Sequence, residues 1–105
     1  MKIYKTQAEI EADIVDGVLT VNEDVKFECS FSINASLKIE GDIDARNIDA
    51  WDIDACNIDA WNINALDISF WAVCFAYNSF KCKSIAGRRD NAKYFCLDKE
   101  VEISK

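Results

Sequence analysis

Apolar and polar residues recur along this chain with a period of five between Gly41 and Phe70. The first apolar column consists of Ile43, Ile48, Ile53, Ile58, Ile63 and Ile68, and Val73 extends it. The second column lies two residues further on and consists of Ala45, Ala50, Ala55, Ala60 and Ala65, followed by Phe70, Phe75, Phe80 and Ile85. Apolar steps of two and three residues therefore alternate along this stretch.

This period fits neither an α-helix nor a straight β-strand. On a helix, each five-residue step rotates the isoleucine column by about 140°, which scatters the isoleucines around the helix. In a strand, an odd step sends successive isoleucines to opposite faces. The pattern is satisfied when a short extended segment is followed by a corner that always turns in the same sense. Stacked coils of this kind form a β-solenoid.

The polar residues of the repeat are suited to the corners. They form two columns, Asp44, Asp49, Asp54, Asp59 and Asn64, and Asn47, Asp52, Asn57, Asn62 and Asp67. Asp and Asn form hydrogen bonds with nearby backbone and tolerate unusual backbone angles. The chain has no proline, so every backbone N–H is available for hydrogen bonds between coils.

The units 68–72 and 73–77, ISFWA and VCFAY, resemble the repeats of pentapeptide-repeat proteins. Repeats of that family have a small apolar residue, Asp or Asn, a central Leu or Phe, and two variable residues. The resemblance covers residues 41–87 and implies an all-β fold, a right-handed parallel β-helix with four repeats in each square turn. In the earlier units Ile comes first and Ala is central, so the spacing matches the family more closely than the residue types do. The chain is also similar to small repeat proteins carried by phages and mobile elements of Firmicutes.

The 105 residues are predicted to form one domain with four segments. These are an N-terminal strand and helix cap (1–17), less regular first coils (18–40), pentapeptide-like repeats (41–87) and a C-terminal cap (88–105). Thr6 and Glu9 have the spacing of a capping box, which predicts a short helix near residues 7–15 over the open end of the solenoid. Two closing strands are expected at residues 94–97 and 101–103.

Three tryptophans lie ten residues apart, at Trp51, Trp61 and Trp71. With four units in a turn, Trp51 and Trp71 would lie one coil apart, about 4.8 Å, and Trp61 on the opposite wall. Two interpretations are open. The tryptophans cover corners, or they form a contact surface, since aromatic residues anchor many interfaces.

The net charge of −7 is unevenly distributed. Residues 1–60 contain 14 acidic and 5 basic residues, whereas residues 61–105 contain 5 acidic and 7 basic residues. The candidate partner-binding acids are Glu23, Asp24, Glu28, Glu40, Asp42, Asp44, Asp49, Asp52, Asp54 and Asp59. With four units in a turn, the four aspartates at 44, 49, 54 and 59 would form a ring around the solenoid. A phosphate-like track of carboxylates along the solenoid axis would also need the acids of the first coils and of the start of the repeats, Glu23, Asp24, Glu28, Glu40 and Asp42.

An acidic rod of this kind resembles DNA, which carries a negative charge about every 1.7 Å of its axis. Some pentapeptide-repeat proteins are DNA mimics that act on topoisomerases, so the resemblance favours mimicry. The main hypothesis is an inhibitor that binds a DNA-binding nuclease or effector complex, of anti-CRISPR or anti-restriction type, without contacting nucleic acid or membrane. The alternative is a self-assembling solenoid or homodimeric scaffold. Acidic and basic residues gather in opposite halves, and the aromatic residues near the last coil would supply a dimer face, namely Phe70, Phe75, Phe80 and Tyr94.

Enzymatic activity is not expected, because the sequence has no His, no GxSxG motif and no phosphate-binding loop. The five cysteines, at 29, 56, 74, 82 and 96, have no metal-ligand spacing, so neither metal nor cofactor is expected. Reduced thiols in the cytoplasm are predicted, which means the host cytoplasm if a phage encodes the chain. A signal peptide and a membrane span are not expected, since no suitable apolar run occurs.

Overall fold

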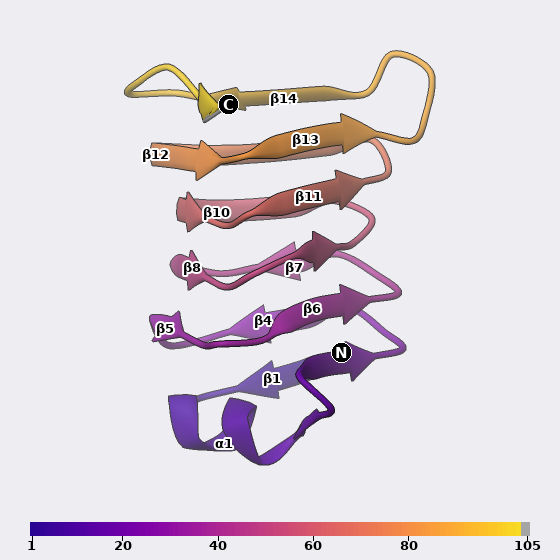
Figure 1. Cartoon of the computed structure of the whole chain (residues 1–105), viewed down its shortest axis with the longest axis vertical. Helices are drawn as coiled ribbons and strands as arrows, with labels where there is room; N and C mark the ends of the chain where they lie inside the picture. The colour runs from indigo at the N-terminus through magenta and orange to yellow at the C-terminus, as the bar shows by residue number, and fades with distance from the viewer. Residues whose placement is uncertain (104–105) are drawn as a thin grey trace.

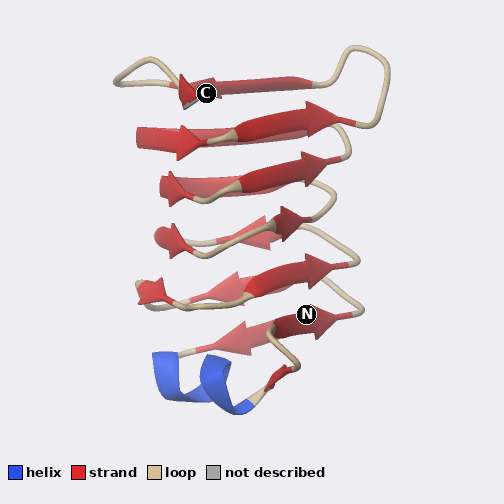
Figure 2. Ribbon diagram, viewed as in Figure 1, coloured by secondary structure: helices blue, strands red, loops and turns tan. Residues whose placement is uncertain are grey.

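A computed structural model describes residues 1–103 as a β-solenoid of about five turns, with 54% of residues in strands and 6% in a helix (Figures 1 and 2). Its principal extents are 33 × 24 × 23 Å. In Figure 1 the nearer strands run left to right and the farther strands run right to left as the chain rises, which is right-handed winding. The predicted parallel β-helix is therefore confirmed.

The strands form three faces, which we call faces 1, 2 and 3. Face 1 contains β1 (Lys2–Tyr4), β4 (Val25–Phe27), β7 (Ile43–Asp44), the first halves of β10 (Ile58–Asn64) and β12 (Val73–Cys82), and β14 (Lys93–Cys96). Face 2 contains β5 (Phe31–Ser32), β8 (Asn47–Asp49), the second halves of β10 and β12, and β15 (Glu102–Ile103). Face 3 contains β2 (Ile14–Val15), β3 (Val18–Val21), β6 (Ser36–Ile39), β9 (Ile53–Asp54), β11 (Asp67–Phe70) and β13 (Ser84–Gly87). Neighbouring strands are parallel except for the hairpin of β2 and β3.

Three five-residue units make one turn, so the expected square coil of four units is wrong. Ile58 lies directly above Ile43, and Ile63 above Ile48, which is a step of fifteen residues. The physical reason lies in the interior volume. Alanine takes the place of the large central residue of the family, and protein interiors are filled to crystal-like density. Three isoleucines and three alanines fill a narrow triangular coil, whereas a square coil would leave a void.

The two predicted inward columns are buried throughout the regular repeats. Each isoleucine from Ile43 to Ile68 is at most 3% exposed, and each alanine from Ala45 to Ala65 at most 5%. The register then changes, because Ile58 pairs with Cys74, sixteen residues on. Cys74 and Ala76 point inward in the next coil, and the expectation that Phe75 extends the inward column is wrong.

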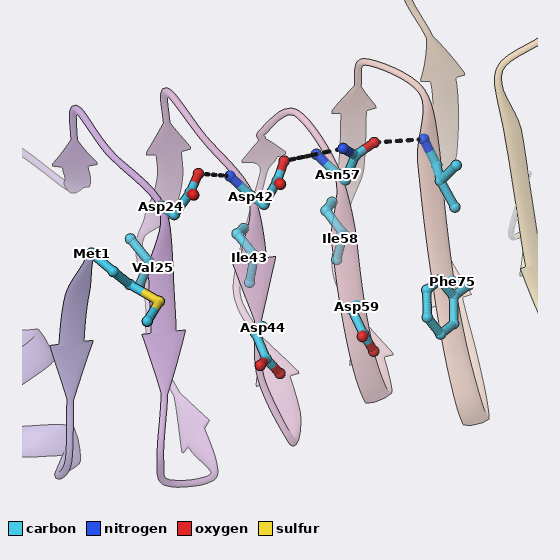
Figure 3. A pocket seen from close by; sticks show the side chains of 11 residues that line it. Met1, Asp24, Val25, Asp42, Ile43, Asp44, Asn57, Ile58, Asp59 and Phe75 are labelled. Atoms are coloured by element: carbon cyan, nitrogen blue, oxygen red, sulfur yellow. Dashed lines mark hydrogen bonds between the residues drawn. The ribbon is translucent and has the colours of Figure 1, made fainter.

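Polar side chains at the three corners link each coil to the next. At the corner between faces 3 and 1, the N–H of Asp42 donates to Asp24 (2.8 Å), and the N–H and side-chain amide of Asn57 donate to Asp42 (3.1 Å each) (Figure 3). Asn57 in turn accepts from the N–H of Val73. Three of these bonds satisfy backbone N–H groups at or next to the corner, those of Asp42, Asn57 and Val73.

The other two corners carry similar ladders. One runs through Ser30, Asn47, Asn62 and Ser79. The other runs through Ser36, Asp52, Asp67 and Ser84. The second polar column of the repeat therefore forms the corners, as the sequence indicates.

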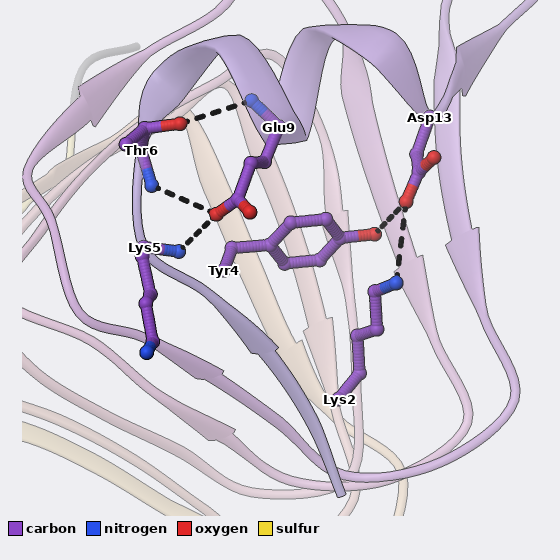
Figure 4. Close-up of polar contacts among 6 residues, drawn as sticks. All are labelled: Lys2, Tyr4, Lys5, Thr6, Glu9 and Asp13. Atoms are coloured by element: carbon purple, nitrogen blue, oxygen red, sulfur yellow. Dashed lines mark hydrogen bonds and ion pairs between the residues drawn. The ribbon is translucent and has the colours of Figure 1, made fainter.

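The N-terminal end of the solenoid is closed by a short helix, α1 (Gln7–Ala12). The predicted capping box is confirmed, since Thr6 accepts from the N–H of Glu9 and Glu9 accepts from the N–H of Thr6 (3.2 Å each) (Figure 4). Ile10 is fully buried beneath the first coil. The helix ends earlier than expected, because residues 14–21 form the hairpin of β2 and β3 around Asp16 and Gly17, which both have positive φ.

Candidate interaction surface

Six of the ten candidate acids gather on face 1 and on the corner that leads into it. Asp44 and Asp59 lie on the outer side of β7 and β10, in register and one coil apart. Asp24 and Asp42 lie beside them as consecutive members of the corner ladder. Glu23 and Glu40 flank this corner, since Gly41 is stacked against Glu23 and Asp24. We call Glu23, Asp24, Glu40, Asp42, Asp44 and Asp59 the acidic patch.

A shallow hollow of about 280 Å³ lies on the acidic patch. Its lining includes Asp24, Asp42, Asp44, Asn57, Asp59 and Phe75 (Figure 3). Three basic groups are close to the patch. Lys26 is the register neighbour of Asp44, and the amino group of Met1 forms an ion pair with Glu23 (2.8 Å). Arg46 lines a neighbouring hollow together with Asp44 and Lys26. With six acidic side chains, the patch keeps an excess of negative charge.

The other four candidate acids lie elsewhere. Asp49 is on face 2, where it accepts from Ser32 (3.1 Å), and Asp52 belongs to the corner ladder between faces 2 and 3. Asp54 is on face 3 and forms an ion pair with Arg88. Glu28 follows β4, beside Arg46. The expected ring of four aspartates on four walls is wrong, because the fifteen-residue turn places Asp44 and Asp59 on the same face.

The tryptophans occupy three different corners, so the expected proximity of Trp51 and Trp71 is wrong. A spacing of ten residues is two thirds of a turn when three units make a coil. Leu66 lies above Trp51 (N–H to carbonyl 2.6 Å), and Trp71 lies above Cys56 (2.7 Å). All three tryptophans are exposed.

An outer aromatic cluster lies above the acidic patch. Phe75 is the register neighbour of Asp59 and stacks on Phe95, with ring centroids 5.3 Å apart. Tyr77 packs edge-on against Phe75 (5.5 Å) and against Trp61 (6.1 Å). The sequence indicates Trp61 as a surface aromatic but places Phe75 in the inward column, because the sixteen-residue step that turns Phe75 outward leaves no clear mark in the repeat.

The position of Asp59 affects its acidity. Partial burial is the main reason that the pKa of Asp59 is raised, and the negative charge of Asp44 adds to the effect. The folded state therefore holds the Asp59 proton more tightly than the unfolded chain does. The free energy of unfolding falls as the pH rises through the pKa of Asp59. At neutral pH Asp59 is ionised, and its charge destabilises the folded state in full.

We expect Asp59→Asn to raise the melting temperature at pH 7 and to leave it unchanged at pH 3, where Asp59 is protonated in both states. Asparagine removes the repulsion from Asp44, and Asp42 and Asn57 already form a stacked Asp–Asn pair of this kind. Thermal unfolding at both pH values measures the effect. Asp49→Asn is the control, because its register neighbours are Ser32 and Asn64. An equal stabilisation at both pH values would contradict the assignment.

Other potential chemistry is limited in the part of the chain that the structure describes. No group of three or more metal-ligating side chains occurs within residues 1–103. All five cysteines are free, and burial raises the pKa of the Cys74 thiol, with a smaller effect from Cys82. A protonated thiol is a poor nucleophile. Across the same residues, no helix has the length and hydrophobicity that crossing a bilayer requires.

Comparisons with protein-family models, curated proteins and solved structures found no match to this chain. The β-solenoid is thus known from the structure itself. The pentapeptide-repeat resemblance rests on residues 41–87 alone, where the spacing fits that family and the three-unit turn does not.

Proposed function

We propose that this chain is a binding protein whose acidic patch occupies a basic surface on a nucleic-acid-binding protein. The stacking of the carboxylates supports this proposal most directly. Asp24 and Asp42 form one column along the solenoid axis, and Asp44 and Asp59 form a second beside it. Successive members of each column are separated by about 4.8 Å, the spacing of paired strands.

The patch has features that favour tight electrostatic recognition. Hydrogen bonds to the next coil fix the carboxylates of Asp24 and Asp42, so little side-chain entropy is lost on binding. Carboxylates on a rigid scaffold present negative charge to arginines and lysines as phosphates do. The patch spans only about two coil spacings, roughly 10 Å, so it matches the length of a short stretch of phosphates along DNA.

The more specific proposal is inhibition by DNA mimicry. The chain would block the DNA-binding groove of a nuclease or effector complex in the cytoplasm, as a phage-encoded anti-CRISPR or anti-restriction protein does. The protein target, and not DNA itself, is the partner in this proposal. Binding should weaken at high salt, because exposed charges are screened.

The test is a competition assay in which the chain displaces fluorescently labelled DNA from restriction or CRISPR effectors, and the released DNA is measured. The parent chain is compared with two variants of equal net charge. The patch variant carries Glu23→Gln, Glu40→Gln, Asp44→Asn and Asp59→Asn, which spares the corner ladder. The control carries Glu28→Gln, Asp49→Asn, Asp98→Asn and Glu100→Gln, all outside the patch. We expect the parent and the control to displace DNA, and the patch variant to need at least about tenfold more protein, or 1.4 kcal/mol.

Two results would contradict the proposal. The first is that the parent displaces DNA from no restriction or CRISPR effector tested. The second is an equal loss in the patch variant and the control, which would show that total charge matters and the patch does not.

A further inference from the structure

The two ends of the solenoid differ in how they are covered. At the N-terminal end, α1 lies over the first coil, and Tyr4, Ile10 and Leu19 are at most 2% exposed. The hydroxyl of Tyr4 donates to Asp13 just after the helix (2.8 Å), which fixes the helix to the coil (Figure 4). Figure 2 shows that, among the described residues, the opposite end consists of strands and loops.

At the C-terminal end, inward positions are open to solvent. Tyr94 lies directly above Cys74, and Ile103 directly above Cys82. The lower residue of each pair is at most 3% exposed, whereas Tyr94 and Ile103 are each 41% exposed. Tyr94 still packs on the buried ring of Phe70 (centroids 6.4 Å apart), so it faces the core. These side chains are exposed because no described residue lies above them.

The backbone at this end is also unpaired. Within residues 1–103, β14 and β15 pair only with β12 below them, and β13 pairs only with β11. Their outer edges present N–H and carbonyl groups in strand geometry, which readily pair with another chain. Leu97, 59% exposed, adds apolar surface directly after β14. Solenoids generally need such an end to be covered.

We propose that a second copy of this chain covers the C-terminal end. The C-terminal ends of the two copies would face each other, related by a two-fold axis perpendicular to the solenoid axis and to β14. The helix α1 blocks the other end of the molecule, which excludes head-to-tail stacking. The two-fold reverses the chain direction, so β14 would pair antiparallel with β14 of the second copy. Tyr94, Leu97 and Ile103 of both copies would be buried together.

Charge and area are compatible with such a dimer. The end carries both signs, from Lys93, Asp98, Lys99 and Glu100, so a two-fold contact can pair opposite charges. The cross-section has extents of 24 × 23 Å. It offers roughly 500 Å² per copy and about 1,000 Å² in total, which is near the lower limit for specific interfaces. The dimer should therefore be weak and depend on concentration.

Sedimentation equilibrium over a wide concentration range tests this proposal. The monomer mass is 11.9 kDa, and we expect the average mass to approach twice that value as concentration rises. Leu97→Asp and Ile103→Asp should each hold the mass at the monomer value, with circular dichroism unchanged. Val15→Asp, at a residue that is 67% exposed near the capped end, is the matched control and should still dimerise.

A monomer at every concentration would overturn the proposal, as would assemblies that grow beyond two copies. Equal loss of the dimer in Val15→Asp would also overturn it, because that residue is at the wrong end. The proposal does not depend on the acidic patch. A monomeric Leu97→Asp chain that still displaces DNA would separate the two functions.

Discussion

Ile58→Ala is expected to lower the free energy of unfolding by about 2–5 kcal/mol, the usual cost of truncating a fully buried isoleucine. Ile58 is 1% exposed and lies between Ile43 in the coil below and Cys74 in the coil above. The narrow interior offers few ways to fill the space that the side chain leaves. The loss should therefore be close to the upper end of the range.

Urea unfolding followed by circular dichroism measures this effect. Lys38→Ala is the matched control, because Lys38 lies on the exposed side of face 3, where its loss should change stability by less than about 0.5 kcal/mol. A similarly small loss for Ile58→Ala would contradict the tight packing of the inward column. Loss of two-state unfolding would show that the coils on either side can separate, as in other repeat proteins.

The sequence was sufficient to predict the solenoid, because its two apolar columns can share an interior only if the chain turns at regular corners. It also predicted the helical cap, since the capping box of Thr6 and Glu9 is a local signal. The number of units in a turn could not be read in this way. A period of five residues fixes where the corners fall, whereas the angle at each corner depends on how Ile and Ala fill the interior.

The acidic patch shows the same limit. Its columns depend on the register between coils, and the coil that joins Val25 to Ile43 has eighteen residues where the regular coils have fifteen. That length places Asp24 beneath Asp42, but the irregular sequence of residues 18–40 gives no period from which to predict it. The outer position of Phe75 was missed for a similar reason, because a single additional residue changes which side chains point inward.

Gly41→Ala is expected to destabilise the fold by about 1–3 kcal/mol, the usual range for overpacking, and to weaken the proposed binding as well. A Cβ atom at Gly41 would lie 2.7 Å from the backbone N of Asp24 and 2.8 Å from the backbone carbon of Glu23. Backbone atoms cannot rotate aside, so the two coils must separate at the corner that aligns Asp24 with Asp42. Cys56 lies one coil above Gly41, making Cys56→Ala the control for urea unfolding and DNA competition. If Gly41→Ala matched that control in both measurements, the close contact of the coils at this corner would be refuted.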